Sequence, residues 1–404
     1  MAFDLFLYIA DLIEKKYNKY FMHHSSADDY LLYFPHPPAS TLSQWLEESN
    51  RITRHILENI PAADHIVPQL HILNPPLWEF GHLTWFHEFW VHRGGQVSNP
   101  SFMVDADHLF NSSEIAHEDR WSTPMPSLDS LLEYNLNVIS STQELLCKPI
   151  DNKAAYFIQP SIFHQDMHNE AFAYMWQTMG RPMPFLPLSD RSLSNENKQT
   201  WIHFPESSLE ADSHQGSGFI FDNEKWAHTI NAPSFDISSS PVTNAEYLTY
   251  LESASNLSQL EPAAPPKHWK KEDGLWFERF FDEWLPLDPL SAVRHINYFD
   301  AQHYCKVNGL RLPNEHELTI LISQKSTAWQ PSHLWEWTSS PFSPFPGFSP
   351  DPCTDYSLPW FNGKYQVLKG GSLYTPDRLK RAAFRNFYQP NRSDHFCGFR
   401  TCLL

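Results

Sequence analysis

Two histidines four residues apart give the strongest chemical signal in this chain. His164 and His168 stand in His164-Gln-Asp-Met-His168, within a segment whose apolar residues predict a helix from Phe163 to Met179. At this spacing both imidazoles lie on one helical face and can bind one metal ion. A chain with 22 histidines also produces such a pair by chance. An imidazole on an apolar helix nevertheless needs a partner, and a metal ion is one such partner.

A third candidate ligand, His82, lies in a second apolar segment at residues 76–86. One histidine from this segment and two from the other make a three-histidine metal site. Such a site leaves other coordination positions open for a substrate or for oxygen.

Helices that could position these ligands are predicted before residue 180. Apolar residues recur at intervals of three and four in four segments, at residues 42–60, 76–93, 127–147 and 154–179. Four amphipathic helices predict a bundle, in which ligand sites are built from the inward side chains of facing helices. We expect a helical domain with the metal site at residues 40–180, after an N-terminal extension, residues 1–39, that has no assigned role.

The composition changes after the predicted bundle. Residues 181–210 are rich in Pro, Ser, Asn and Asp, which predicts a linker. In residues 211–404, short strand-like runs such as 218–221 and 365–368 alternate with Gly, Pro and Asn turns. The chain is therefore predicted to be an α+β multidomain protein with an irregular second domain.

Composition also limits the class of ligand. The 404 residues predict two domains of roughly 150–200 residues each. With 29 Lys and Arg against 47 Asp and Glu, the net charge is −18 and the cations are not clustered. Nucleic acid and anionic membrane are therefore disfavoured as partners. Aromatic residues make up 15% of the chain, which favours buried or ligand-lining aromatic surfaces and a small-molecule ligand.

Cysteine usage and the N-terminus bear on location. The five cysteines are scattered without a CxxC pair, which predicts neither a zinc knuckle nor a disulfide framework. Residues 1–11 are apolar but broken by acids, which predicts an amphipathic helix and not a signal peptide. No run of about 18 apolar residues occurs, so no membrane span is expected. We predict a cytoplasmic protein; its oligomeric state is not readable from the sequence.

Seven phrases in the second half resemble the formylglycine-generating-enzyme fold, a C-type-lectin-like domain of irregular strands and two helices. In chain order they are Pro241-Val-Thr-Asn-Ala-Glu-Tyr247, Ala301-Gln-His-Tyr-Cys305, Arg311-Leu-Pro-Asn-Glu315, Leu334-Trp-Glu-Trp-Thr338, Gly370-Gly-Ser372, Phe384-Arg-Asn386 and Gly398-Phe-Arg400. The N-terminal helices with the three histidines resemble a DinB-like four-helix bundle. The two domains in this order, over residues 40–404, resemble the ergothioneine-type sulfoxide synthases.

That resemblance implies a reaction and a cofactor. Enzymes of this family use a three-histidine Fe(II) centre and O2 to join the sulfur of a thiol donor to C2 of the imidazole of hercynine, the trimethylated form of histidine. By similarity, His82, His164 and His168 are the iron ligands. Three neutral imidazoles leave up to three positions in an octahedral shell, enough for the sulfur, the hercynine imidazole and O2.

The resemblance also implies substrate-binding residues. Arg120 occupies the place of a family arginine that binds a carboxylate of the sulfur donor, a task suited to a bidentate guanidinium. Asn386 would bond the hercynine carboxylate, and Phe387 would face the trimethylammonium group. Arg392 would bind an acidic group of the donor. Each residue also has a structural reading, Arg120 as an N-cap or surface residue and Phe387 as part of an aromatic core.

Three positions depart from the family pattern. Met167 stands where many members have a glutamine that contacts hercynine. Tyr388 replaces an acid that holds the amino group of the donor, so the donor remains open. The proton-donating tyrosine of the family aligns with Cys353, and in another subgroup near Phe110. Tyr356, three residues after that cysteine, is our candidate, because a phenol can donate a proton.

Several alternatives stay open. The phrase at 166–174 also resembles the selenoneine synthases, which take a selenosugar without an α-amino group. Glu170 within it would orient a ligand or form an interhelical or solvated salt bridge. A copper-dependent formylglycine-generating oxidase would need paired cysteines, for which Cys397 and Cys402 are the nearest in sequence. A non-catalytic module that binds a small ligand is the third class.

Overall fold

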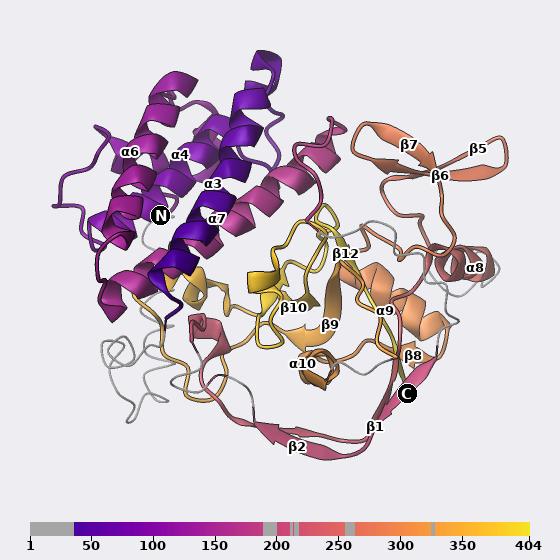
Figure 1. Cartoon of the computed structure of the whole chain (residues 1–404). Coiled ribbons are helices and arrows are strands. Elements are labelled where there is room, and N and C mark those ends of the chain that lie inside the picture. Colours follow the sequence, from indigo (N-terminus) through magenta and orange to yellow (C-terminus); the bar gives the residue numbers. More distant parts are fainter. Residues whose placement is uncertain (1–35, 189–199, 211–212, 214–217, 255–262, 325–327) are drawn as a thin grey trace, which may run out of the picture.

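The computed structural model has a helical N-terminal part and a C-terminal part built from sheets (Figure 1). It describes residues 36–188, 200–210, 213, 218–254, 263–324 and 328–404. The helix predicted at residues 1–11 and most of the N-terminal extension lie outside this description. Among the described helices, none is long and apolar enough to cross a membrane.

In the described residues of the N-terminal part, four long helices lie at the positions expected from the sequence. They are α3 (Ala39–Asn59), α4 (Pro76–His87), α6 (Leu128–Leu146) and α7 (Asn152–Met179). A π-helical segment, η2 (Glu88–His92), extends α4, and two short pieces, α5 (Ala106–Phe110) and η3 (His117–Trp121), lie in the connection to α6. Figure 1 shows the long helices packed side by side.

Local residue choices set the ends of these helices. The Ser127 side chain accepts the backbone N–H of Ser130 at the start of α6, and Asp151 accepts that of Ala154 at the start of α7. Gly180 ends α7 with φ +66°, a left-handed conformation that glycine adopts without strain. These caps fix where α7 begins and ends, and α7 carries two of the three candidate ligands.

The described residues of the C-terminal part form two four-stranded sheets, one two-stranded ribbon and one three-stranded ribbon. The first sheet has the order β1-β4-β13-β8 and the second β11-β10-β9-β12. The ribbons are β2-β3 and β5-β6-β7. The strands are β1 (Trp201–Phe204), β2 (Ser207–Glu210), β3 (Thr229–Ala232), β4 (Phe235–Ser238), β5 (Trp269–Glu272), β6 (Leu275–Phe280), β7 (Glu283–Pro286), β8 (Leu310–Arg311), β9 (Trp335–Pro341), β10 (Gln366–Gly370), β11 (Asn386–Tyr388), β12 (Cys397–Gly398) and β13 (Cys402–Leu403). The helices α8 (Asn244–Ala254), α9 (Tyr298–Val307) and α10 (Glu315–Gln324) accompany them. This arrangement is the α+β architecture expected from the sequence.

Two segments differ from the sequence-based expectation. Residues 201–210, expected to belong to the linker, form β1 and β2, because they pair with the later strands β4 and β3. Residues 218–221, expected to be strand-like, form no strand. Their phenylalanines instead pack toward α7, where the rings of Phe163 and Phe219 lie 5.2 Å apart.

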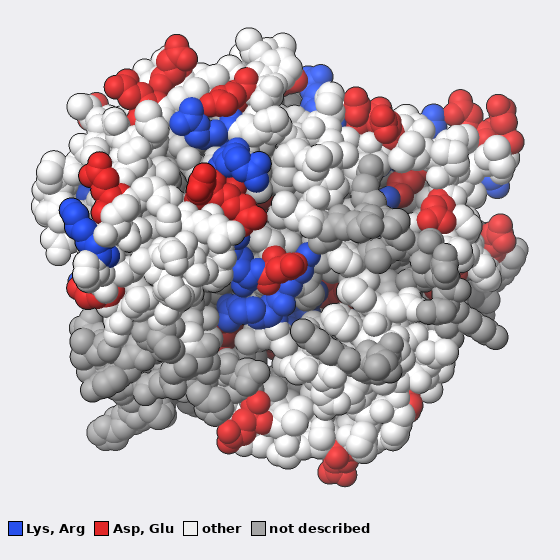
Figure 2. All heavy atoms as spheres, in the orientation of Figure 1, with Lys and Arg blue, Asp and Glu red and all other residues white. Residues whose placement is uncertain are grey.

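Polar and charged side chains join the two parts. Buried Glu170 of α7 accepts hydrogen bonds from Ser372, Thr375 and the Trp335 indole. It is therefore neither a salt-bridging nor a solvated residue, since its partners are neutral donors from the C-terminal part. Arg378 forms a salt bridge with Asp166 of α7. Figure 2 shows Lys and Arg atoms gathered where the helices meet the C-terminal part. These contacts hold α7 against the second half of the chain.

Candidate metal centre

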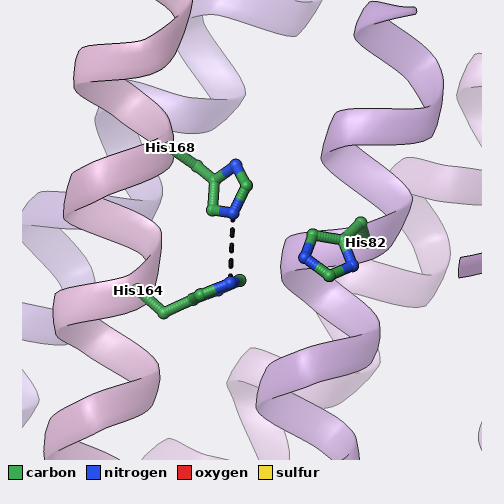
Figure 3. Close-up of side chains that lie close together, drawn as sticks. All are labelled: His82, His164 and His168. Carbon is green, nitrogen blue, oxygen red and sulfur yellow. Dashed lines mark hydrogen bonds between the residues drawn. The ribbon is translucent and has the colours of Figure 1, made fainter. Parts of the chain in front are cut away.

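Three imidazoles from two helices converge in the bundle. His82 comes from α4, and His164 and His168 come from α7, which packs against α4. Each of the three residues offers a nitrogen, and these nitrogens lie within 4.8 Å of one another. The Nε2 atoms of His164 and His168 are 3.0 Å apart (Figure 3). The spacing of four residues therefore places two side chains on one face, as expected, and helix packing adds the third.

Burial keeps two of the rings, those of His82 and His164, in the form that binds metal. Burial and the nearby His168 lower the pKa of His82 to about 3. Burial also lowers the pKa of His164 well below its ordinary value. A neutral imidazole has a free lone pair for a metal ion, whereas a protonated one does not. The imidazoles of His82 and His164 are thus able to bind a metal cation.

The outer ring nitrogens orient two of the imidazoles. Nδ1 of His82 lies 2.8 Å from the carbonyl oxygen of Phe110, and Nδ1 of His168 faces the Glu79 carboxylate. Both contacts leave Nε2 as the nitrogen directed at the centre. Nδ1 of His164 is buried and has no hydrogen-bond partner within the described part of the chain. Gly81 is required here, because a Cβ would lie 2.1 Å from the Phe110 ring.

Three converging imidazoles, two of them with their outer nitrogens held by an acceptor, fit a borderline divalent metal ion such as iron, zinc or copper. The set contains no carboxylate or thiolate ligand, so it does not select a hard cation such as calcium. The residues present are therefore chemically suited to the iron that the sequence resemblance implies.

A chain of polar contacts connects the site to Arg120. Glu79 of α4 is buried and also accepts a hydrogen bond of 2.6 Å from Asn74. Burial alone would raise the pKa of Glu79, but the adjacent His168 lowers it below the ordinary value. The Arg120 guanidinium donates to Asn74 and lies 3.8 Å from the centre of the Trp78 ring. It is therefore neither an N-cap nor a free surface arginine.

Trp78 connects this arginine to the metal site. Its ring stacks on His82, with centroids 4.9 Å apart and an interplanar angle of 6°. The candidate donor-binding residue and one candidate ligand thus both contact the same indole. A shift of the Arg120 guanidinium would therefore displace the Trp78 ring and, through it, the His82 imidazole.

The residues expected from the C-terminal part are placed in two groups. The Tyr388 ring stacks on His395 at 4.0 Å, and the Arg392 guanidinium lies 5.0 Å from the centre of the same Tyr388 ring. Arg392 is paired with Asp394, with contacts of 2.6 and 2.5 Å. Its charge is therefore already neutralised.

The second group packs elsewhere. The Phe387 ring stacks on Phe342 with centroids 3.9 Å apart, so one ring face is covered and the packing reading describes it. The Asn386 side chain accepts the backbone N–H of its own neighbour at 2.9 Å. Among the described residues, neither side chain forms a hydrogen bond or a ring contact with the three histidines.

An aromatic cavity lies beside His164 at the junction of the two parts. Its walls include Phe86, Trp90 and Phe157 from the helices and Phe219, Phe221 and Tyr356 from the C-terminal part. His164, Met167 and Cys353 also line it. The Tyr356 hydroxyl lies 4.0 Å from the Met167 sulfur, and its ring stacks on Phe221 at 4.6 Å. Burial raises the pKa of Tyr356 well above its ordinary value, so the phenol keeps its proton.

Sequence reasoning missed acidic residues near the site, among them Glu79 and Asp222. Glu79 stands three residues before His82 on the same helix, and this spacing could have indicated a carboxylate close to the ligands. Asp222 lines the aromatic cavity and has no such signal, because only the packing of a C-terminal segment against α7 brings it there.

The chain is similar to known proteins over both parts. The sequence model of the sulfatase-modifying factor enzyme 1-like domain matches residues 193–327 and 333–403. Hercynine oxygenase of Mycobacterium tuberculosis is 25% identical over 396 residues, covering 81% of this chain and 91% of that protein. Ergothioneine biosynthesis protein 1 of Schizosaccharomyces pombe is 24% identical, covering 92% of this chain and 57% of that protein. Formylglycine-generating enzyme of Streptomyces coelicolor is 22% identical, covering 46% of this chain and 83% of that protein.

Proposed function

Since the chain belongs to the sulfatase-modifying factor enzyme 1-like family and to the ergothioneine-type sulfoxide synthases, we propose that it is an oxygenase that modifies hercynine. The reaction would join the sulfur or selenium of a donor to C2 of the hercynine imidazole. The observation that carries this proposal is the convergence of three imidazoles beside a cavity formed by both parts of the chain. Ligand sites are commonly found at such junctions.

We assign Fe(II) to the site, held by His82, His164 and His168. Zinc also binds imidazole ligands but has no redox chemistry. A reaction that consumes O2 needs a redox-active metal. Iron, when bound, would supply the redox chemistry that activates O2. Glu79 would hold His168 in its orientation from the outer side.

The atoms of the proposed reaction balance with O2 as the oxidant. The C2–H bond of hercynine and the S–H bond of a thiol donor break, and a C–S bond forms. For a sulfoxide product, one oxygen atom of O2 ends on sulfur and the other leaves as water with both hydrogens. No external reductant is then required.

The protein side chains would position the reactants and move one proton. Arg120 would bind a carboxylate of the donor, supported by its place on Trp78 next to the Glu79 and His168 pair. Tyr356 would donate a proton from its hydroxyl, since it lines the same cavity as His164 and stays protonated at neutral pH. Both roles rest on the resemblance together with these contacts.

The donor is either a thiol or a selenosugar. Tyr388 provides no carboxylate for an α-amino group, and the carboxylate of Asp394 nearby is engaged by Arg392. This arrangement is compatible with a donor that has no α-amino group, as in the selenoneine synthases. A cytoplasmic location remains a prediction from the sequence.

The copper-oxidase alternative is weakly supported by the residues. Cys397 is fully buried and its thiol donates to the carbonyl oxygen of Ile296 at 3.0 Å. Burial raises the pKa values of Cys397 and Cys402 well above the ordinary value, which disfavours the thiolates that copper binds. The two residues also belong to different sheets.

The decisive experiment is an anaerobic Fe(II) titration followed by incubation with hercynine, O2 and a panel of thiols and selenosugars. We expect stoichiometric iron and an imidazole-linked product detected by mass spectrometry. Iron binding without any such product would refute the synthase proposal. Absence of bound iron would favour the non-catalytic binding module.

A further inference from the structure

Lys369, on β10, is a buried lysine that has no role in the proposed chemistry. The residue is 2% exposed. Its ammonium donates one hydrogen bond, of 2.6 Å, to the carbonyl oxygen of Ala382 and forms no salt bridge within the described part of the chain. An ammonium has three N–H donors. A buried charge without a counter-ion is costly, and an anionic ligand can remove that cost.

Two glutamates act on Lys369 electrostatically, but each is already paired with an arginine. Glu315 accepts from Arg385 at 2.8 and 3.2 Å. Glu224 accepts from Arg381 at 2.9 and 3.1 Å. The three cations of this cluster therefore face two carboxylates. Burial lowers the pKa of Lys369 to about 8, so most of the side chain is still charged at neutral pH. One positive charge in this interior thus lacks a counter-ion.

A cavity of about 160 Å³ lies beside this ammonium. Its described walls come from β2, β3, α10 and the segment 382–383, together with Lys369. Ala382, whose carbonyl oxygen binds the ammonium, lines the cavity. Thr319 also lines it, and its hydroxyl lies 3.4 Å from the same oxygen. The charged end of Lys369 is therefore at this wall. The cavity has room for about ten water molecules, enough for a small organic ligand.

This cavity is separate from the site of the proposed chemistry. None of its described walls lines the aromatic cavity beside His164. In the view of Figure 1, α10 and β2 lie below β9 and β10, whereas α4 lies above them. A ligand bound here would therefore not reach the three histidines.

The walls limit the ligand to one negative charge and an apolar body. Aliphatic side chains line the cavity from three elements, namely Leu209, Ile230 and Ile320. Lys369 is the only Lys or Arg among the described walls, and Glu210 is the only acid. Glu210 would repel a second negative charge, such as that of a phosphate ester. The walls thus favour a monoanion with a short apolar tail.

We propose that this cavity binds an organic monocarboxylate with a short apolar tail, and that Lys369 is its counter-ion. The carboxylate would accept hydrogen bonds from the ammonium. Burial lowers the pKa of His316, another wall residue, so this imidazole is neutral at pH 7 and can donate a further hydrogen bond without adding charge. The inference does not depend on the proposed function.

The test measures the binding of pentanoate and of pentanamide, its uncharged analogue, to the full chain by ligand-observed NMR titration. Metal-free protein is used, because a carboxylate can also bind a metal ion. Wild type should bind pentanoate about tenfold more tightly than pentanamide, as for one charge-assisted hydrogen bond. Lys369→Met keeps the length of the side chain but not its charge, so this preference should disappear. Lys364→Met, at an exposed position, should behave like wild type.

A second variant tests the location of the ligand. Leu209→Trp would fill the cavity from β2 and leave Lys369 in place, so the binding of both ligands should be lost. This measurement is informative even if Lys369→Met fails to fold. Binding to Leu209→Trp as tight as to wild type would show that the ligand lies elsewhere.

Other results would overturn the proposal. If Lys369→Met keeps the preference for pentanoate, Lys369 is not the counter-ion. If Arg120→Met loses pentanoate and Lys369→Met does not, the carboxylate binds at the proposed donor site. Urea denaturation separates a purely structural role, because replacing a buried charge without a counter-ion by an apolar side chain should not lower the midpoint. A lower midpoint in Lys369→Met, together with no pentanoate binding to wild type, would assign Lys369 to internal charge balance alone.

Discussion

The Glu79 carboxylate faces Nδ1 of His168 on the side opposite to the three-nitrogen cluster. The two residues come from α4 and α7, so this contact holds the helices in the register that brings the third imidazole, His82, into place. The second carboxylate oxygen of Glu79 accepts a hydrogen bond from the Asn74 amide. The oxygen of that amide accepts a hydrogen bond from Arg120. One buried carboxylate therefore orients a candidate ligand and links it to the candidate donor-binding arginine.

Replacing Glu79 by Gln should weaken metal binding without abolishing it. The amide keeps the shape but loses the charge that orients the imidazole, and losses of roughly 10- to 100-fold in metal affinity are typical for such changes. Competition with a chelator measures the Kd for Fe(II). Glu58→Gln, an exposed position in α3, is the control, and equal affinities in the two variants would contradict the role given to Glu79.

His164→Ala should remove metal binding almost completely. Two remaining imidazoles cannot complete the three-nitrogen set, so we expect the Fe(II) affinity to fall by about 100-fold or more. Bound iron after anaerobic loading is the measurement. The exposed His55→Ala serves as the matched control. Full iron occupancy in His164→Ala would mean that the cluster is not the metal site.

Tyr356→Phe should alter the product more than the binding of substrates. The phenyl ring preserves the stack on Phe221 but removes the proton that the hydroxyl would donate. We expect less imidazole-linked product and more oxidation of a thiol donor to its sulfinic acid, with the KM for hercynine changed less than threefold. Mass spectrometry measures the ratio of imidazole-linked product to sulfinic acid in the variant and in wild type. An unchanged ratio would assign the proton to another group.

Glu170→Ala should destabilise the junction between the two parts. Ser372, Thr375 and the Trp335 indole would lose their acceptor in a buried site, at a cost of about 3 kcal/mol in the free energy of unfolding. Urea denaturation measures this change. Glu170→Gln retains one acceptor oxygen, so its free energy of unfolding should fall less than that of Glu170→Ala. The exposed Glu133→Ala in α6 should stay within about 0.5 kcal/mol of wild type.

Stability should decrease as the pH falls below 6.5. Burial lowers the pKa values of His268 and His395 to about 3, so in this window the unfolded chain binds protons that the folded chain does not. Each residue then contributes a loss of about 2 kcal/mol between pH 7 and pH 5. Urea midpoints across this range measure the slope. In His395→Gln the urea midpoint should change less with pH than in wild type. An equal pH dependence in the two proteins would show that the His395 ring takes up protons in the folded state.

Helical periodicity in the first half was predictable from the chain itself. A recurrence of apolar residues at three and four reflects one buried face, and the capping residues Ser127 and Asp151 mark two of the starts. The pair His164 and His168 was equally visible, because their relative position depends only on the pitch of one helix. Short strands such as β1 and β2 were not predictable, since each depends on a partner strand far along the chain.

The sequence by itself determined the two-part architecture and which three histidines to consider together. Local interactions and the resemblance to a known family sufficed for both. Only the tertiary structure decided that Glu79 supports His168, that Glu170 binds neutral donors, and that Asp222 reaches the cavity beside His164. The reason is physical: contacts between residues distant in the chain depend on how helices and loops pack, and no local spacing encodes that packing.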